Sequence, residues 1–171
     1  MDTVEQFRIL GEEKKGWFDC DKIAKIIFDY IVEQPEETYE VVIGTDSQNH
    51  ERTKISKVIA ARRIGHGGKV FYKNEFGDRI DDLRQKIYEE TQQSLSIANE
   101  VVEKVEMLFL ENEIDIEQMN VSFQIHCDIG RYGKTQTLIK DITSWVQSLG
   151  FEVQIKPDSW AASAVADKLS K

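Results

Sequence analysis

The strongest constraint on the fold of this chain is an apolar run that ends on a carboxylate. Residues 39–46 read Tyr-Glu-Val-Val-Ile-Gly-Thr-Asp, so that branched apolar residues lead almost directly to Asp46. A run of this kind predicts a buried strand. Residues 119–127 form a second such run, and Asp128 follows it. A carboxylate at the rim of a core needs a proton, a cation or hydrogen-bond donors to offset the loss of water. The sequence therefore predicts two buried strands that each end on an acid.

Apolar periodicity predicts a mixed α/β fold for the whole chain. Helical spacing occurs in residues 19–34, 81–112, 134–149 and 159–169. Strand patterns occur in residues 39–46, 54–64, 69–76, 119–127 and 151–155. The glycine-rich residues 65–68 predict a hairpin between the second and third strands. We therefore expect an N-terminal helical extension over residues 1–37. A single domain should follow over residues 38–171, with a mixed sheet and helices on both faces.

The composition limits the class of protein. Cys20 and Cys127 are the only cysteines among 171 residues, and their separation favours two reduced, buried thiols over a disulfide or a zinc site. The N-terminus lacks a basic and then apolar signal, and no run reaches the roughly 18 apolar residues of a membrane span. These features predict a soluble, cytoplasmic protein with no membrane partner.

The charge distribution bears on the partner. The formal net charge of −9 argues against a nonspecific coat for nucleic acid. However, the excess of acids lies in residues 1–42 and 80–118, away from Asp46 and Asp128. A polyanion could therefore still approach these two acids, above all with a bound metal ion. Solvated helix faces would explain the same asymmetry.

The two acids at the strand ends predict a cation site. If the strands are parallel neighbours, the carboxylates of Asp46 and Asp128 lie side by side. Two such charges about 4 Å apart repel by roughly 4 kcal/mol at an effective dielectric constant of 20. Magnesium is the expected ion for a site made of oxygen ligands. The alternative is that each aspartate caps the turn that follows its strand.

Two further acids are candidates for the same site. Glu90 interrupts the apolar stripe of the helix over residues 81–112, whereas Glu89 falls further toward solvent, so Glu90 is preferred. A salt bridge from Glu90 to Lys86 is the alternative. Asp167 can project over the strand ends from the last predicted helix, although an isolated acid there would more often be exposed.

At these residues the chain resembles the ribonuclease H-like superfamily, and within it the YkuK-type family of uncharacterised bacterial proteins. The resemblance rests on Ile43-Gly44-Thr45-Asp46-Ser47-Gln48 and on the segment from Lys156-Pro157-Asp158-Ser159-Trp160 to Asp167. It implies a five-stranded sheet of order 3-2-1-4-5. It also implies that Asp46, Glu90 (or Glu89), Asp128 and Asp167 bind divalent ions and catalyse the reaction.

The implied activity is phosphodiester hydrolysis of RNA or DNA by two Mg²⁺ or Mn²⁺ ions. Arg131 and Lys134, in the loop after Asp128, could hold substrate phosphates, or they could be solvated surface charges. The classical enzymes that cleave RNA/DNA hybrids have a glycine- and histidine-bearing loop before the last helix. This chain has only residues 155–158 there.

Two other functions stay open at the level of sequence. The first is a noncatalytic module for nucleic-acid or protein interaction that keeps the acids for folding or metal binding. The second is a phosphodiesterase for nucleotides or another small ligand, which an acidic surface would tolerate better. Neither the oligomeric state nor the sugar of the substrate follows from the residues.

Overall fold

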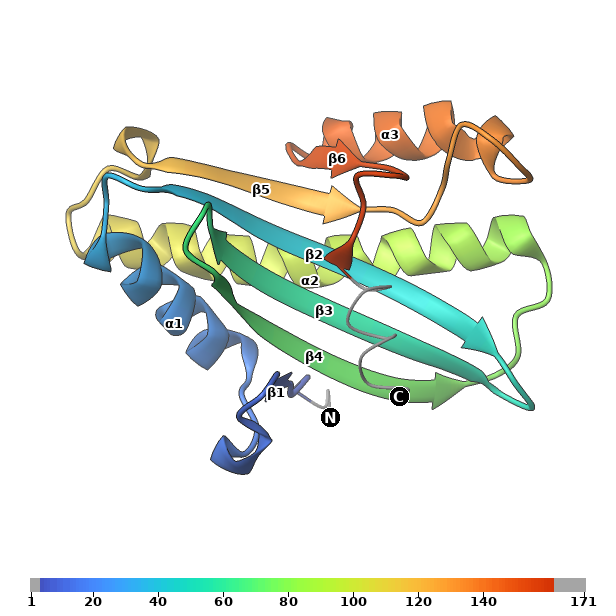
Figure 1. Cartoon of the computed structure of the whole chain (residues 1–171), viewed down its shortest axis with the longest axis horizontal. Coiled ribbons are helices and arrows are strands. Elements are labelled where there is room, and N and C mark those ends of the chain that lie inside the picture. Colours follow the sequence, from blue (N-terminus) through green and yellow to red (C-terminus); the bar gives the residue numbers. More distant parts are fainter. Residues whose placement is uncertain (1–3, 162–171) are drawn as a thin grey trace.

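The computed structural model describes residues 4–161 and contains one six-stranded mixed sheet with helices packed against it (Figure 1). The strands are β1 (Arg8–Ile9), β2 (Thr38–Asn49), β3 (Thr53–Arg63), β4 (Gly68–Gly77), β5 (Asn120–His126) and β6 (Glu152–Gln154). The helices are α1 (Cys20–Glu33), α2 (Leu83–Glu111) and α3 (Ile139–Ser148), with short 3-10 helices at Glu13–Lys15, Ile116–Gln118 and Gln136–Leu138. Asp167 and most of the predicted last helix lie outside the described residues.

The predicted strand order is confirmed, with one strand added. The sheet runs β1-β4-β3-β2-β5-β6, so that the five predicted strands stand in the expected order 3-2-1-4-5. The additional strand β1 pairs antiparallel with β4, Ile9 opposite Phe71. The expectation of five strands was therefore one too low. Two residues are too few to give a period-two pattern, which explains why this strand is not visible in the sequence.

The connection through α2 makes β2 and β5 parallel neighbours. The strand β2 pairs antiparallel with β3, and β3 with β4, as the hairpin prediction required. On its other side β2 runs parallel to β5, with Gly44 opposite His126. Two residues further along each chain, Asp46 and Asp128 reach the same end of the sheet. Parallel strands joined by a crossover helix bring their carboxyl ends to one edge, and this places both acids there.

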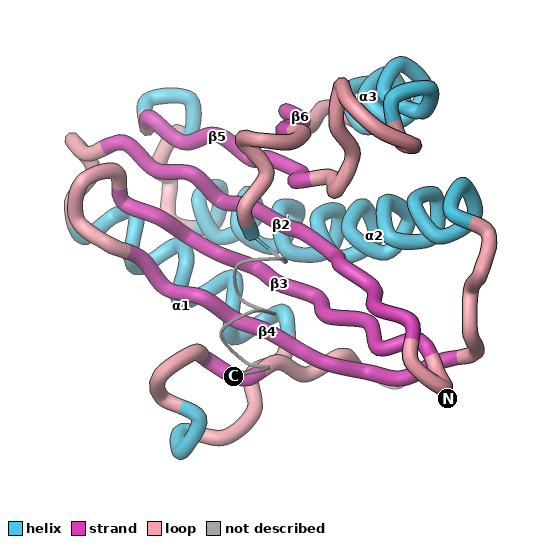
Figure 2. The backbone as a smooth tube through the Cα atoms, turned by 45° about the vertical axis from the view of Figure 1, so that its right-hand side comes forward, coloured by secondary structure: helices cyan, strands magenta, loops and turns pink. Residues whose placement is uncertain are grey.

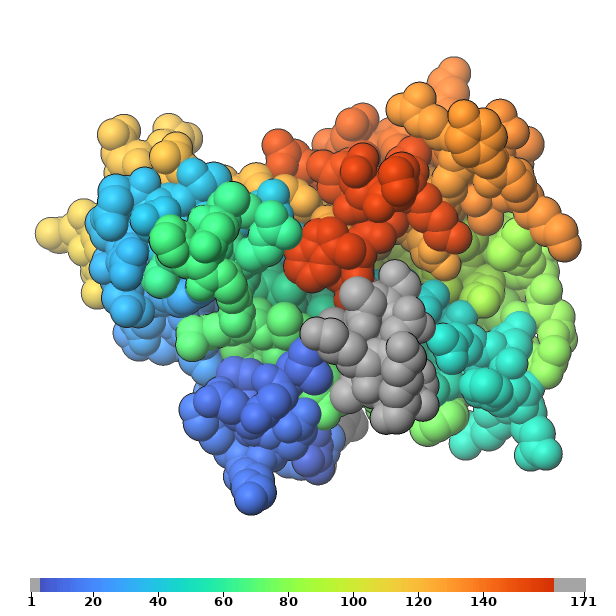
Figure 3. Space-filling view, viewed as in Figure 1, coloured from blue at the N-terminus to red at the C-terminus, as the bar shows by residue number. Residues whose placement is uncertain are grey.

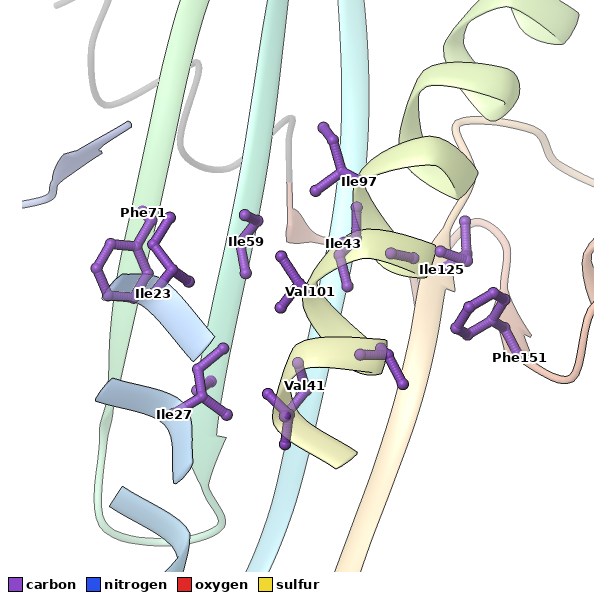
Figure 4. Close-up of a cluster of buried hydrophobic side chains, with 14 of the residues drawn as sticks. Ile23, Ile27, Val41, Ile43, Ile59, Phe71, Ile97, Val101, Ile125 and Phe151 are labelled. Carbon is purple, nitrogen blue, oxygen red and sulfur yellow. The ribbon is translucent and has the colours of Figure 1, made fainter. Parts of the chain in front are cut away.

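One face of the sheet is covered by α1 and α2, as the backbone view shows (Figure 2). Every second residue of β2 faces these helices. Val41 and Ile43 point into the main core, where Ile97 and Val101 of α2 lie over them (Figure 4). The same close-up places the α1 side chains beside those of β3 and β4, and the labelled residues there are Ile23, Ile27, Ile59 and Phe71. All of these side chains belong to one buried cluster.

The opposite face carries a smaller buried cluster of Val42, Val58 and Ala161, with Trp160 packed against it. The segment that follows β6 crosses in front of β5 and β2 to reach this cluster (Figure 1). The space-filling view places this segment over the middle of the sheet (Figure 3). Residues close to the end of the described chain are thereby brought to the strand ends that carry Asp46 and Asp128.

Local signals in the sequence agree with these elements. Asp19 is the N-cap of α1, and its side chain accepts a hydrogen bond of 2.9 Å from the backbone N–H of Lys22. Cys20 and Cys127 are both free and buried, as predicted. No helix within residues 4–161 has the length and apolar content that a membrane crossing requires.

Candidate metal centre

Asp46 and Asp128 form the centre of the site. Both side chains are half-buried, Asp46 near the end of β2 and Asp128 two residues beyond β5. Both residues line a small cavity of about 10 Å³, which is close to the volume that one water molecule needs. Burial raises the pKa of the Asp46 carboxyl, and the neighbouring charge of Asp128 raises it further. The pair is therefore a place where negative charge is crowded and incompletely offset.

Glu90 is the third acid of the site. Its side chain enters from α2 and is only 6% exposed, whereas Glu89 is exposed. The Oε1 atom of Glu90 accepts hydrogen bonds from the backbone N–H of Ser47, at 3.0 Å, and from the Ser47 hydroxyl, at 2.5 Å. Burial raises the pKa of Glu90 to about 8, and the charges of Asp46 and Asp128 act in the same direction. These hydrogen bonds tie Glu90 to the residue next to Asp46.

The predicted preference for Glu90 over Glu89 agrees with this burial. The alternative, in which Glu90 pairs with Lys86, is not what the structure has, because within residues 4–161 the hydrogen bonds of Glu90 come from Ser47. Lys86 lies near enough to lower the pKa of both Glu90 and Asp46 through its charge, against the larger effect of burial.

His126, the last residue of β5 and opposite Gly44 of β2, is a structural residue that the sequence reasoning missed. Its Nδ1 atom accepts hydrogen bonds from the backbone N–H groups of Trp160, at 3.1 Å, and Ala161, at 3.4 Å. Its Nε2 atom lies 3.3 Å from Oε1 of Gln124. Burial lowers the pKa of His126 to about 4, so the ring is neutral near pH 7. Because Nδ1 is occupied in this way, His126 holds the segment after β6 close to the acids.

Lys156 is the second residue that sequence reasoning missed. Its Nζ atom lies 2.8 Å from Oδ1 of Asp128. This hydrogen bond, together with the charges of Asp128, Asp46 and Glu90, raises the pKa of the Lys156 ammonium. The available signal was its position, because Lys156 opens the second phrase on which the family resemblance rests.

The loop after Asp128 carries the two predicted phosphate ligands. Arg131 and Lys134 are both exposed there, and Tyr132 between them is 93% exposed. The base of the loop is held by a hydrogen bond of 3.1 Å from the backbone N–H of Gly130 to the Thr135 hydroxyl. Neither Arg131 nor Lys134 forms an ion pair within the described part of the chain. A role for these two cations in substrate binding stays a prediction.

The donor atoms of the site fit a hard divalent cation, but the site is not a closed cage. Carboxylate oxygens are the ligands that Mg²⁺ and Mn²⁺ prefer. Among residues 4–161, however, no three histidine, cysteine, aspartate or glutamate side chains are grouped closely enough to hold a metal ion. Asp46 and Asp128 supply an adjacent pair, Glu90 is turned toward Ser47, and the predicted fourth acid, Asp167, lies outside the described residues.

Comparison with known proteins gives two matches. A protein-family model described as "Ribonuclease H-like" matches residues 22–171. The "Uncharacterized protein YkuK" of Bacillus subtilis (strain 168) is 34% identical over 146 residues, which cover 83% of this chain and 85% of that protein. No solved structure gives a significant match.

Proposed function

The chain belongs to the ribonuclease H-like family, and from this premise we propose that it is a divalent-metal-dependent nuclease that hydrolyses phosphodiester bonds of RNA or DNA. One observation carries the proposal. Two acids from neighbouring parallel strands, Asp46 and Asp128, meet at one end of the sheet beside a buried third acid, Glu90. Burial, and after it the charges of the neighbouring carboxylates, raise the pKa values of Asp46 and Glu90, and shifts of this kind are common at functional sites.

Asp46 and Asp128 would be the principal ligands of Mg²⁺ or Mn²⁺. Glu90 and Asp167 would complete the set, and Ser47 would orient Glu90 through its two hydrogen bonds. Divalent ions in such a site supply Lewis-acid activation of water and of the phosphate that is cleaved. The chain itself holds Asp46 near the end of β2, Asp128 just beyond β5 and Glu90 buried on α2.

Substrate phosphates would reach the site across the loop that follows β5. Arg131 and Lys134 are exposed there and are free to approach a phosphate, and the exposed ring of Tyr132 could stack on an unpaired base.

A second candidate function is favoured by one observation. Because residues 4–161 contain no preformed group of three metal-ligating side chains, a noncatalytic module for nucleic-acid or protein interaction is also consistent with this fold. This module would use the loop at residues 130–134 for binding and would not cleave its partner.

Cleavage assays on the full chain test the first proposal. Labelled single-stranded, duplex and hybrid oligonucleotides should be cut in the presence of Mg²⁺ or Mn²⁺. Asp46→Asn should lower the rate by at least 100-fold, because the substitution removes a charged ligand while keeping its size. Mn²⁺ binding, measured by isothermal titration calorimetry, should weaken in parallel.

Asp29→Asn is the matched control, since it makes the same chemical change at an exposed residue of α1 that pairs with Lys25. It should leave both cleavage and Mn²⁺ binding unchanged. Cleavage that survives Asp46→Asn would contradict the proposal. Metal binding without cleavage of any oligonucleotide would favour the interaction module instead.

A further inference from the structure

We propose that Lys156 acts as a built-in counter-ion that competes with divalent cations for Asp128. The ammonium group of Lys156 lies 2.8 Å from Oδ1 of Asp128, which is the distance of a direct charged hydrogen bond. It therefore occupies one of the oxygen atoms that a metal ion at this site would use. This inference rests on the proposed function, because it requires the acids to be a cation site.

The backbone fixes the position of Lys156. Beyond the end of β6, its N–H donates a hydrogen bond of 2.8 Å to the carbonyl oxygen of Ile129, the residue after Asp128. The aliphatic stem of the lysine passes close to Gly130, where an added Cβ would lie 3.3 Å from Cβ of Lys156. This backbone hydrogen bond and the close approach to Gly130 together hold Lys156 beside Asp128.

The exposure of the pair indicates that the contact can be exchanged. The side chain of Lys156 is 56% exposed and that of Asp128 is 39% exposed. Ion pairs with this much access to water contribute little to stability, so a divalent cation can displace the ammonium at low cost. Glu90, in contrast, is buried and held by Ser47. The exchange therefore involves Asp128 and leaves the inner part of the site in place.

Electrostatics predicts the consequence for metal affinity. While Lys156 sits on Asp128, its positive charge offsets the negative charge of that carboxylate, so the site attracts a divalent ion less strongly. A neutral residue of similar length would remove this effect. Displaced from Asp128, the ammonium would remain at the rim of the site, where it could contact a phosphate of the substrate.

The test compares Mn²⁺ binding to the full-length wild type with binding to Lys156→Met, by isothermal titration calorimetry and by electron paramagnetic resonance of free Mn²⁺. Lys156→Met should bind Mn²⁺ about tenfold more tightly, and Lys156→Arg should bind it about as weakly as wild type. Lys14→Met is the matched control for net charge, because Lys14 is exposed in the 3-10 helix at Glu13–Lys15, and it should not change the affinity.

Equal affinity of wild type and Lys156→Met would overturn the role of Lys156 while leaving the metal site intact. Absence of Mn²⁺ binding in both proteins would overturn the cation site itself, and this inference with it. A second measurement uses wild type alone. Acetylation of Lys156, followed by mass spectrometry, should become faster when Mn²⁺ is added, and an unchanged or slower rate would contradict the exchange.

Discussion

Single residues decide how charge is balanced at the end of the sheet. The sequence marked Asp46 and Asp128 as candidates and preferred Glu90 to Glu89, because each of the three interrupts or closes an apolar pattern. Lys156 and His126 could not be found in this way. A lysine in a turn and a histidine in a strand have no periodic signal, and their partners, Asp128 and Ala161, lie far away in the sequence.

The buried carboxyl of Glu90 predicts a pH dependence of stability. Its pKa is about 8 in the folded protein against 4.5 for the ordinary group, so the folded state binds more protons than the unfolded state between these values. Metal-free wild type should therefore lose stability relative to Glu90→Gln as pH rises from 4.5 to 8. The expected loss is on the order of 1–3 kcal/mol.

Urea denaturation in EDTA at several pH values measures this difference. Comparison with Glu90→Gln removes the contributions of other groups, such as His126, that titrate in part of the same range. Glu89→Gln changes the exposed neighbouring residue, and its free energy of unfolding should depend on pH as that of wild type does. A difference between wild type and Glu90→Gln that does not change with pH would contradict the assignment.

At the scale of elements, the pairing of strands and the segment after β6 position the site. The hairpin and the crossover helices predicted a mixed sheet, and the resemblance to the ribonuclease H-like superfamily implied the order of its five longer strands, which the structure has. The ends of the strands were harder to predict from the sequence than their order. The strand β2 continues to Asn49, three residues past Asp46, because β3 supplies a pairing partner along its whole length. The sequence gives no sign of where such long-range pairing stops.

The hydrogen bonds of His126 predict how the segment after β6 is anchored. His126→Ala leaves the N–H groups of Trp160 and Ala161 without their acceptor and removes the ring that packs edge-on against Trp160. We expect a loss of about 1–3 kcal/mol in the free energy of unfolding. Hydrogen exchange at the Ala161 amide should become faster.

His126→Asn is the informative companion variant, because its side-chain oxygen can take the place of Nδ1 as an acceptor. It should retain part of the stability and of the amide protection. If both variants had the stability and the Ala161 amide exchange rate of wild type, these hydrogen bonds would not anchor the segment.

For the whole molecule, the candidate site lies at one end of the sheet. The helices α1 and α2 cover one face, and the strand-end acids and the loop with the exposed cations Arg131 and Lys134 lie at that end. The net charge of −9 is therefore compatible with a polyanionic substrate at one place on the surface. The charge asymmetry of the sequence left room for the approach of a polyanion, but it could not predict that Lys156 would join the acids.

Anomalous diffraction from crystals of the full chain grown with Mn²⁺ tests the proposed metal site directly. We expect an Mn²⁺ ion in direct contact with the carboxylates of Asp46 and Asp128, with the ammonium of Lys156 moved away from Asp128. If crystals grown at saturating Mn²⁺ had no ion at these two carboxylates, and Lys156 were still paired with Asp128, the proposed metal site would be contradicted.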